Sequence, residues 1–190
     1  MHHPKLTLAG VGIAGLIALT GCGSDTTTQA PAAPAAGEVT VGESVPHRYT
    51  DARYHYLIDA PGLMTANADG TANYIGPSER MEIAVVTGSG AADPAALAGQ
   101  DAKSLSGSLS GFHQLSSPST VSLNGRSVTK FTFTWNAGTS AVTGKAVELT
   151  SVRYYVPKDS ATLAVITYGI VSNQFDPQGA DDIVSTFKWQ

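Results

Sequence analysis

The sequence predicts an α+β domain, in which an antiparallel sheet of about six strands carries one longer helix and a short C-terminal helix. Three observations predict it: strand-like alternation through the second half of the chain, an Asn124-Gly125 pair within that half, and two Asp-Pro pairs ahead of helical patterns. An Asn-Gly pair between alternating segments is a strong local indication of a hairpin. An Asp-Pro pair favours a helix start, because Asp caps free N–H groups and Pro at the first helical position loses no hydrogen bond.

The first half of the domain has the pattern of strands separated by turns. Tyr54, Tyr56 and Ile58 fall on one face of a single strand. That strand begins near Tyr49, and Pro61-Gly62 ends it as a turn. We expect a loop at residues 65–72, a short strand at 73–77 and a clearer strand at 82–87.

Both Asp-Pro pairs precede apolar residues at helical spacing. Asp93-Pro94 predicts a helix from Pro94 to Leu109. Asp176-Pro177 predicts a short helix that ends near Ser185, after which the C-terminal aromatic residues should pack on the domain. The apolar face of the first helix comprises Ala98, Ala102, Leu105, Leu109 and Phe112, and the C-terminal aromatic residues are Phe187 and Trp189.

The second half is nearly all strand. Strands at 121–123 and 126–135 flank the Asn-Gly pair, and Phe131, Phe133 and Trp135 share a face that should enter the core. Strands from Lys145 to Val156 and from Ala161 to Ser172 should form a second hairpin, with its turn at 157–160. The last strand is apolar on both faces, which indicates a central strand covered on both sides.

The N-terminus has the pattern of a lipoprotein signal. Residues 1–21 comprise a short basic start, an apolar run and small residues, as in a secretory signal peptide. The run from Leu6 to Thr20 is shorter than the roughly 20 residues that a membrane span needs. Leu19-Thr20-Gly21-Cys22 resembles the lipobox of bacterial lipoproteins, which implies that Cys22 is lipid-modified and becomes the first residue of the mature chain. An ordinary secreted protein is the alternative.

Residues 22–46 read as a lipid-anchored Thr/Ala/Pro tether, followed by one domain at 47–190. Cleavage before Cys22 removes one charge, Lys5, and leaves 10 Lys and Arg against 15 Asp and Glu, a formal charge of −5. This acidity argues against nucleic acid as a partner. The expected location is the extracytoplasmic face of the cell membrane, with the membrane as a partner through the lipid on Cys22.

The order of elements resembles the PsbP-like fold. The resemblance rests on the tyrosine-rich first strand before Pro61-Gly62, the Asn124-Gly125 hairpin, the Tyr154-Tyr155-Val156-Pro157 edge and the ending Ile183-Val184-Ser185-Thr186-Phe187. With its lipobox and tether, the chain is also similar to the actinobacterial LpqN/LpqT lipoproteins. The resemblance implies this fold and a non-enzymatic binding or accessory role in the cell envelope. It implies no particular site residue.

Catalytic and metal motifs are weak in this sequence. Ser185-Thr186-Phe187-Lys188 matches the S-x-x-K pattern, but its serine lies near the C-terminus and the partner motifs are incomplete. His47, His55 and His113 each stand alone in their segments, so we expect no metal site and no cofactor. Gly88-Ser89-Gly90 lacks the lysine of a phosphate-binding loop.

The expected function is therefore that of a lipid-anchored, non-enzymatic module that binds an unidentified envelope protein or ligand. Adjacent strand residues point to opposite faces, so Tyr154 or Tyr155 should be exposed, and the pair is the candidate recognition surface. A small-molecule or lipid carrier is the alternative, with a cavity between the helix at 94–109 and the sheet. A hydrolase is less favoured, since it would need His55 or His113 beside a serine in a cleft.

Overall fold

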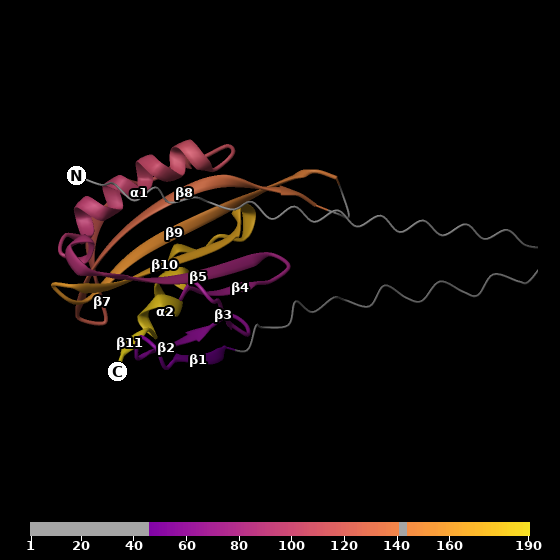
Figure 1. Cartoon of the computed structure of the whole chain (residues 1–190). Coiled ribbons are helices and arrows are strands. Elements are labelled where there is room, and N and C mark those ends of the chain that lie inside the picture. Colours follow the sequence, from indigo (N-terminus) through magenta and orange to yellow (C-terminus); the bar gives the residue numbers. More distant parts are fainter. Residues whose placement is uncertain (1–45, 141–143) are drawn as a thin grey trace, which may run out of the picture. The chain divides into compact units, whose positions relative to one another are not determined.

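A computed structural model of the chain describes residues 46–140 and 144–190, which form three layers (Figure 1). An eight-stranded sheet lies in the middle, helix α1 covers one face, and helix α2 with a three-stranded sheet covers the other. The helices are α1 (Pro94–Ser108) and α2 (Pro177–Ser185), with single turns η1 (Gly88–Ala91) and η2 (Ser172–Gln174). The strands are β1 (His47–Asp51), β2 (Tyr56–Ala60), β3 (Thr65–Ala66), β4 (Ala72–Ile75), β5 (Glu79–Thr87), β6 (His113–Gln114), β7 (Ser119–Leu123), β8 (Arg126–Thr139), β9 (Ala146–Asp159), β10 (Thr162–Val171) and β11 (Lys188–Trp189).

The large sheet is antiparallel throughout, which confirms the α+β class. Its order is β3-β4-β5-β10-β9-β8-β6, and β7 pairs with β8 as well. The sequence predicted about six strands, because two-residue strands such as β3 and β6 are too short to show an alternating pattern. No helix in the described ranges is long and apolar enough to cross a membrane.

The predicted first strand is divided in two, which corrects the expectation of one strand past Tyr49. The Asp51 carboxylate accepts the backbone N–H groups of Arg53 and Tyr54 at 2.9 and 2.7 Å, so the chain turns there. His55 closes the turn with a φ of 56°. The two halves, β1 and β2, pair with each other and with β11 to form the small sheet.

The helix starts were predicted correctly, since they depend on local chemistry. The Asp93 carboxylate accepts the N–H groups of Ala95 and Ala96 at 3.0 and 2.9 Å. Asp176 caps α2 in the same way, through the N–H groups of Gln178 and Gly179. Each helix therefore begins at its proline, with donors satisfied by the preceding aspartate.

The first predicted hairpin is confirmed and the second is shifted. Asn124 and Gly125 have φ values of 48° and 75°, the left-handed pair that a two-residue turn between β7 and β8 requires. In the second hairpin, β9 continues through Pro157 to Asp159, beyond the expected turn. Tyr155 is the last residue of β9 that pairs with β8, so Pro157 lies at an open edge, where a missing N–H is tolerated.

The two faces of the large sheet bury separate hydrophobic clusters. The α2 side packs Tyr56, Ile58 and Phe187 against the sheet, and the α1 side packs Phe131, Phe133 and the small residues of the helix. Strand β10 is buried on both faces, as its apolar pattern predicted. Phe187 is fully buried and Trp189 is half-buried against it, with the two rings edge to face at 5.1 Å.

Candidate binding groove

The tyrosine pair expected to be a recognition surface is buried. Tyr154 and Tyr155 are both 0% exposed, so the expectation that one of them faces solvent is wrong. Their rings point to opposite faces of the sheet, as predicted, but both faces are covered. The Tyr154 hydroxyl donates to Asp181 on α2 at 2.8 Å, and the Tyr155 hydroxyl donates to Asp101 on α1 at 2.7 Å.

Each of these aspartates also accepts from a cation of the sheet. Lys130 Nζ lies 2.6 and 2.7 Å from the two Asp181 carboxylate oxygens, and Arg153 Nε lies 3.0 Å from Asp101. Tyr154 and Tyr155, which are consecutive in β9, thus form hydrogen bonds with the two helices on opposite faces of the sheet. A buried phenol needs a partner for its hydroxyl, and here the helices supply it. Tyr154 and Tyr155 therefore have a structural role.

Burial also raises the pKa of several tyrosines well above the ordinary value of 10.0. Desolvation is the largest cause for Tyr56, Tyr154, Tyr155 and Tyr168, and a neighbouring carboxylate adds to it. The hydroxyl of Tyr168, for example, donates to Glu79 at 2.8 Å. Because the folded state holds these protons more tightly than the unfolded chain, the stabilisation is fully present below pH 10 and is lost as the pH rises further.

The expected result is a free energy of unfolding that falls above pH 10 by about 1.4 kcal/mol per pH unit for each of these four tyrosines. Tyrosinate absorbance and circular dichroism recorded together across an alkaline titration would measure it. The four side chains should ionise only as the domain unfolds. Ionisation of all seven tyrosines of the chain in the folded protein near pH 10 would contradict this interpretation.

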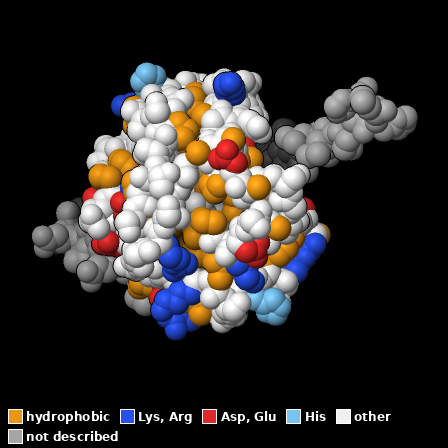
Figure 2. Space-filling view, turned by 90° about the vertical axis from the view of Figure 1, so that its left-hand side faces the viewer, with side chains coloured by type: hydrophobic (Ala, Val, Ile, Leu, Met, Phe, Trp, Pro, Cys, Tyr) orange, Lys and Arg blue, Asp and Glu red, His pale blue; other side chains and the backbone are white. Residues whose placement is uncertain are grey.

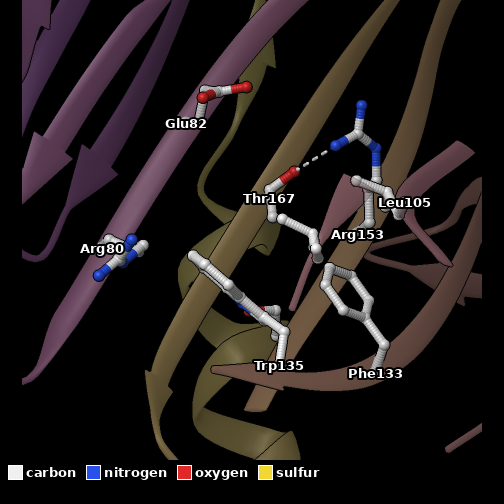
Figure 3. A pocket seen from close by; sticks show the side chains of 9 residues that line it. Arg80, Glu82, Leu105, Phe133, Trp135, Arg153 and Thr167 are labelled. Atoms are coloured by element: carbon white, nitrogen blue, oxygen red, sulfur yellow. Dashed lines mark hydrogen bonds between the residues drawn. The ribbon is translucent and has the colours of Figure 1, made fainter. Parts of the chain in front are cut away.

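A groove of about 220 Å³ opens between the C-terminal part of α1 and the large sheet (Figure 3). Four adjacent strands, β5, β10, β9 and β8, form its floor, and the helix forms one wall. Its lining residues are Arg80, Glu82, Leu105, Leu109, Phe133, Trp135, Ser151, Arg153 and Thr167. This is the place where the carrier alternative expected a cavity.

The floor of the groove borders a close-packed row in the middle of the sheet. Strand register places Arg80, Gly169, Ser151 and Phe133 side by side across the four strands. A Cβ on Gly169 would lie 2.5 Å from the Ser151 hydroxyl oxygen, so that position admits no side chain without rearrangement. The absence of a side chain on Gly169 thus lets the Ser151 and Arg80 side chains pack over it, at the floor of the groove.

Apolar side chains line the groove on the side of β8 and α1. Trp135 is half-buried, and its indole Nε1 donates to the Ser151 hydroxyl oxygen at 3.1 Å, which fixes the ring. The Phe133 ring stacks on Phe112 at 5.3 Å, and Leu105 and Leu109 of the helix region complete this wall. Figure 3 shows Trp135, Phe133 and Leu105 facing the charged residues of β5.

Among the polar residues that line the groove, Arg80 has a buried hydrogen-bond donor without a partner. Its Nε is buried and has no hydrogen-bond partner, and its guanidinium carbon lies 4.9 Å from the centre of the Trp135 ring. Burial lowers the pKa of the Arg80 guanidinium, because desolvation disfavours the charge. Arg153, by contrast, is held by Asp101 and by the Thr167 hydroxyl at 3.2 Å.

A second hollow, of about 420 Å³, lies at the end of the domain where β11 ends. Arg126, Pro157, Lys158, Lys188 and Trp189 line it, and Figure 2, which faces this end, shows Lys and Arg side chains together on its lower part. Arg126 donates to the Phe187 carbonyl, and the Lys158 ammonium lies 5.2 Å from the centre of the Trp189 ring, but this hollow has no buried polar atom without a hydrogen bond on a basic side chain, as the groove has in Arg80. We therefore place the candidate site in the groove beside Arg80.

The other sequence motifs have structural positions. Ser185 of the S-x-x-K match is the last residue of α2 and donates to the Asp182 carbonyl, as a helix-end serine does. His47, His55 and His113 are all exposed, and within residues 46–140 and 144–190 no three His, Cys, Asp or Glu side chains form a group suited to a metal. The lipobox residues Leu19, Thr20, Gly21 and Cys22 lie outside the described residues.

Sequence reasoning missed Arg80 as a site residue and assigned Trp135 to the core alone. The available signal was Gly169, an isolated glycine inside an apolar strand, which indicates a close approach or a gap in the sheet face. The sequence could not indicate which residues lie beside Gly169 on the adjacent strands, because the register across four strands is a tertiary property.

The layers and strand order are those of an α+β domain, as the sequence predicted, and similar solved structures share this fold. One similar solved structure is that of the Ran-binding protein Mog1p from Saccharomyces cerevisiae, which is 12% identical over 76% of this chain and 95% of that one, with a TM-score of 0.52. Another comes from Bacteroides thetaiotaomicron, with 10% identity and a TM-score of 0.51. The match covers 77% of this chain and about half, 49%, of the Bacteroides chain.

LpqN of Mycobacterium tuberculosis, described as involved in cell envelope biogenesis, also matches, at 15% identity over 77% of this chain and 83% of that one, with a TM-score of 0.40. At these identities the likeness concerns the fold. No family model matches the chain, and no curated protein matches it.

Proposed function

We propose that this protein is a lipid-anchored, non-enzymatic binding module of the cell envelope that holds a ligand in the groove between α1 and the sheet. Its partners are the membrane, through the lipid on Cys22, and an envelope component in the groove. A carrier with a cavity between the helix and the sheet is the favoured form of the binding hypothesis, since the groove lies between α1 and the sheet.

The anchor rests on Leu19-Thr20-Gly21-Cys22 and the apolar run before it. More than one acyl chain on a terminal cysteine gives stable membrane attachment where a single chain gives only marginal attachment. The Thr/Ala/Pro tether at 22–46 would then hold the domain on the extracytoplasmic face.

The groove itself is the observation that carries the binding function. Its walls are aromatic and aliphatic side chains, and it contains a polar donor without a partner, which is the usual composition of a small-molecule site. Ser151 lies at the floor of the groove, and its buried hydroxyl accepts a hydrogen bond from the Trp135 indole N–H. The apolar walls and the Arg80 guanidinium are suited to holding a ligand in place.

A neutral apolar dye, N-phenyl-1-naphthylamine, would test this function with the full chain. We expect its fluorescence to rise on binding, and Leu109→Asp to weaken binding about tenfold, because the wall loses apolar contact and gains a charge. Leu115→Asp is the matched control, since Leu115 is 52% exposed and lies outside the groove. Thermal melts of both variants check folding. Equal dye binding by the two variants would contradict the proposal.

A further inference from the structure

We propose that the groove selects amphiphilic ligands that carry an anionic group, a carboxylate or a phosphate monoester, and that Arg80 is the residue that determines this specificity. The inference rests on the proposed function, because it names the chemistry of the ligand in the same groove. It follows from the position of Arg80, the balance of charge around it and the apolar wall that faces it.

The position of Arg80 makes it a ligand-binding group. Its side chain extends from β5, packs beside Gly169 and lines the groove. Its guanidinium carbon lies 4.9 Å from the centre of the Trp135 ring, so a cation–π contact holds the charged group at the wall of the groove. A guanidinium presents its N–H donors in the plane of the group, so an anion that approaches along the groove would meet them edge-on.

The balance of charge singles out Arg80 among the groove residues. Arg153 forms an ion pair with Asp101, with both side chains less than a quarter exposed. In the described part of the chain, the Arg80 guanidinium forms no ion pair, and its Nε forms no hydrogen bond although it is buried. Glu82 is exposed and lies farther along β5, apart from Arg80 in Figure 3. Of the two arginines that line the groove, Arg80 is therefore the one without a carboxylate partner.

A buried donor without a partner and a desolvated charge are both unfavourable, and an anion beside the guanidinium would offset the cost of burying the charge. Burial lowers the pKa of Arg80, which reports the same unfavourable desolvation of its charge. A ligand with a negative head would restore the lost solvation, while its apolar tail would lie along Phe133, Leu105 and Leu109. A volume of about 220 Å³ suits a short alkyl chain.

Three probes that share one alkyl chain separate head-group recognition from apolar binding: octanoate, octyl phosphate and 1-octanol. The full chain with Cys22→Ser avoids lipid in the sample, and Trp189→Phe leaves Trp135 as the single tryptophan reporter. Trp135 fluorescence gives the dissociation constants, and calorimetry without the Trp189 change repeats them. We expect both anionic probes to bind about tenfold more tightly than 1-octanol, because charge-assisted hydrogen bonds exceed neutral ones.

Arg80→Gln should reduce this preference to about twofold or less while 1-octanol binds as before. Arg48→Gln is the matched control, since it removes the same charge from the small sheet, where Arg48 is 65% exposed. A preference retained by Arg80→Gln, or lost equally in Arg48→Gln, would overturn the inference. Equal binding of octanoate and 1-octanol to the unaltered groove would overturn it and leave the proposed function standing. Absence of binding by all three probes would overturn both.

Discussion

Asp181→Ala is expected to lower the free energy of unfolding by about 3 kcal/mol, since it removes the acceptor of a fully buried hydroxyl and the partner of a half-buried cation. The Asp181 carboxylate accepts from the Tyr154 hydroxyl at 2.8 Å and from Lys130 Nζ at 2.6 Å. Tyr154 is 0% exposed, so its hydroxyl depends on this acceptor for a hydrogen bond. Urea denaturation followed by circular dichroism would measure the change.

The matched control is Asp182→Ala, the next residue of α2. Its side chain is exposed and accepts from Gln178 on the same helix, so its loss should change the free energy of unfolding by about 0.5 kcal/mol or less. A double-mutant cycle with Tyr154→Phe should show that the two substitutions are not additive, because both remove the same hydrogen bond. Equal losses for Asp181→Ala and Asp182→Ala would show that α2 is held by apolar packing alone.

Cys22→Ser is expected to move the protein from the membrane fraction to the soluble fraction. Serine has no thiol to receive a diacylglycerol, and the tether that follows offers almost no large apolar side chain to insert into a membrane. The acidic mature chain, with a formal charge of −5 from 10 Lys and Arg against 15 Asp and Glu, would not be attracted to anionic lipid. Fractionation with salt and alkaline washes, together with metabolic labelling by palmitate, would measure the change.

Ser24→Ala controls for the anchor experiment, because it alters a neighbouring residue and leaves Leu19-Thr20-Gly21-Cys22 unchanged. It should remain in the membrane fraction and incorporate the label. If Cys22→Ser still incorporates the palmitate label, the lipid-anchor proposal is wrong. The binding proposal for the groove does not depend on this result.

The features that the sequence predicted correctly are those that depend on a few neighbouring residues. Asp93-Pro94 and Asp176-Pro177 start helices because a carboxylate reaches N–H groups only two and three residues away. The Asn124-Gly125 turn forms because both residues tolerate positive φ. The Asp51 turn was missed although it is equally local, since the alternating tyrosines around it indicated an uninterrupted strand.

The candidate site could be predicted only in part. The location between the helix at 94–109 and the sheet was among the alternatives, because an amphipathic helix on a sheet is a common place for a cavity. The residues that line the site were not predicted, because Arg80 and Trp135 are far apart in sequence and come together only through the strand order β5-β10-β9-β8. Tyr154 and Tyr155 were misplaced because the small sheet and α2 cover a face that the sequence left open.

The sequence by itself determined the helix starts, the first hairpin, the α+β class and the prediction of a lipid anchor at Cys22, because each depends on residue types at short spacing. Only the tertiary structure decided that both tyrosines of β9 are internal and that a groove lined by Arg80 and Trp135 opens between α1 and the sheet. The physical reason is that burial and strand register depend on which layers cover which face, and contacts between distant segments set both.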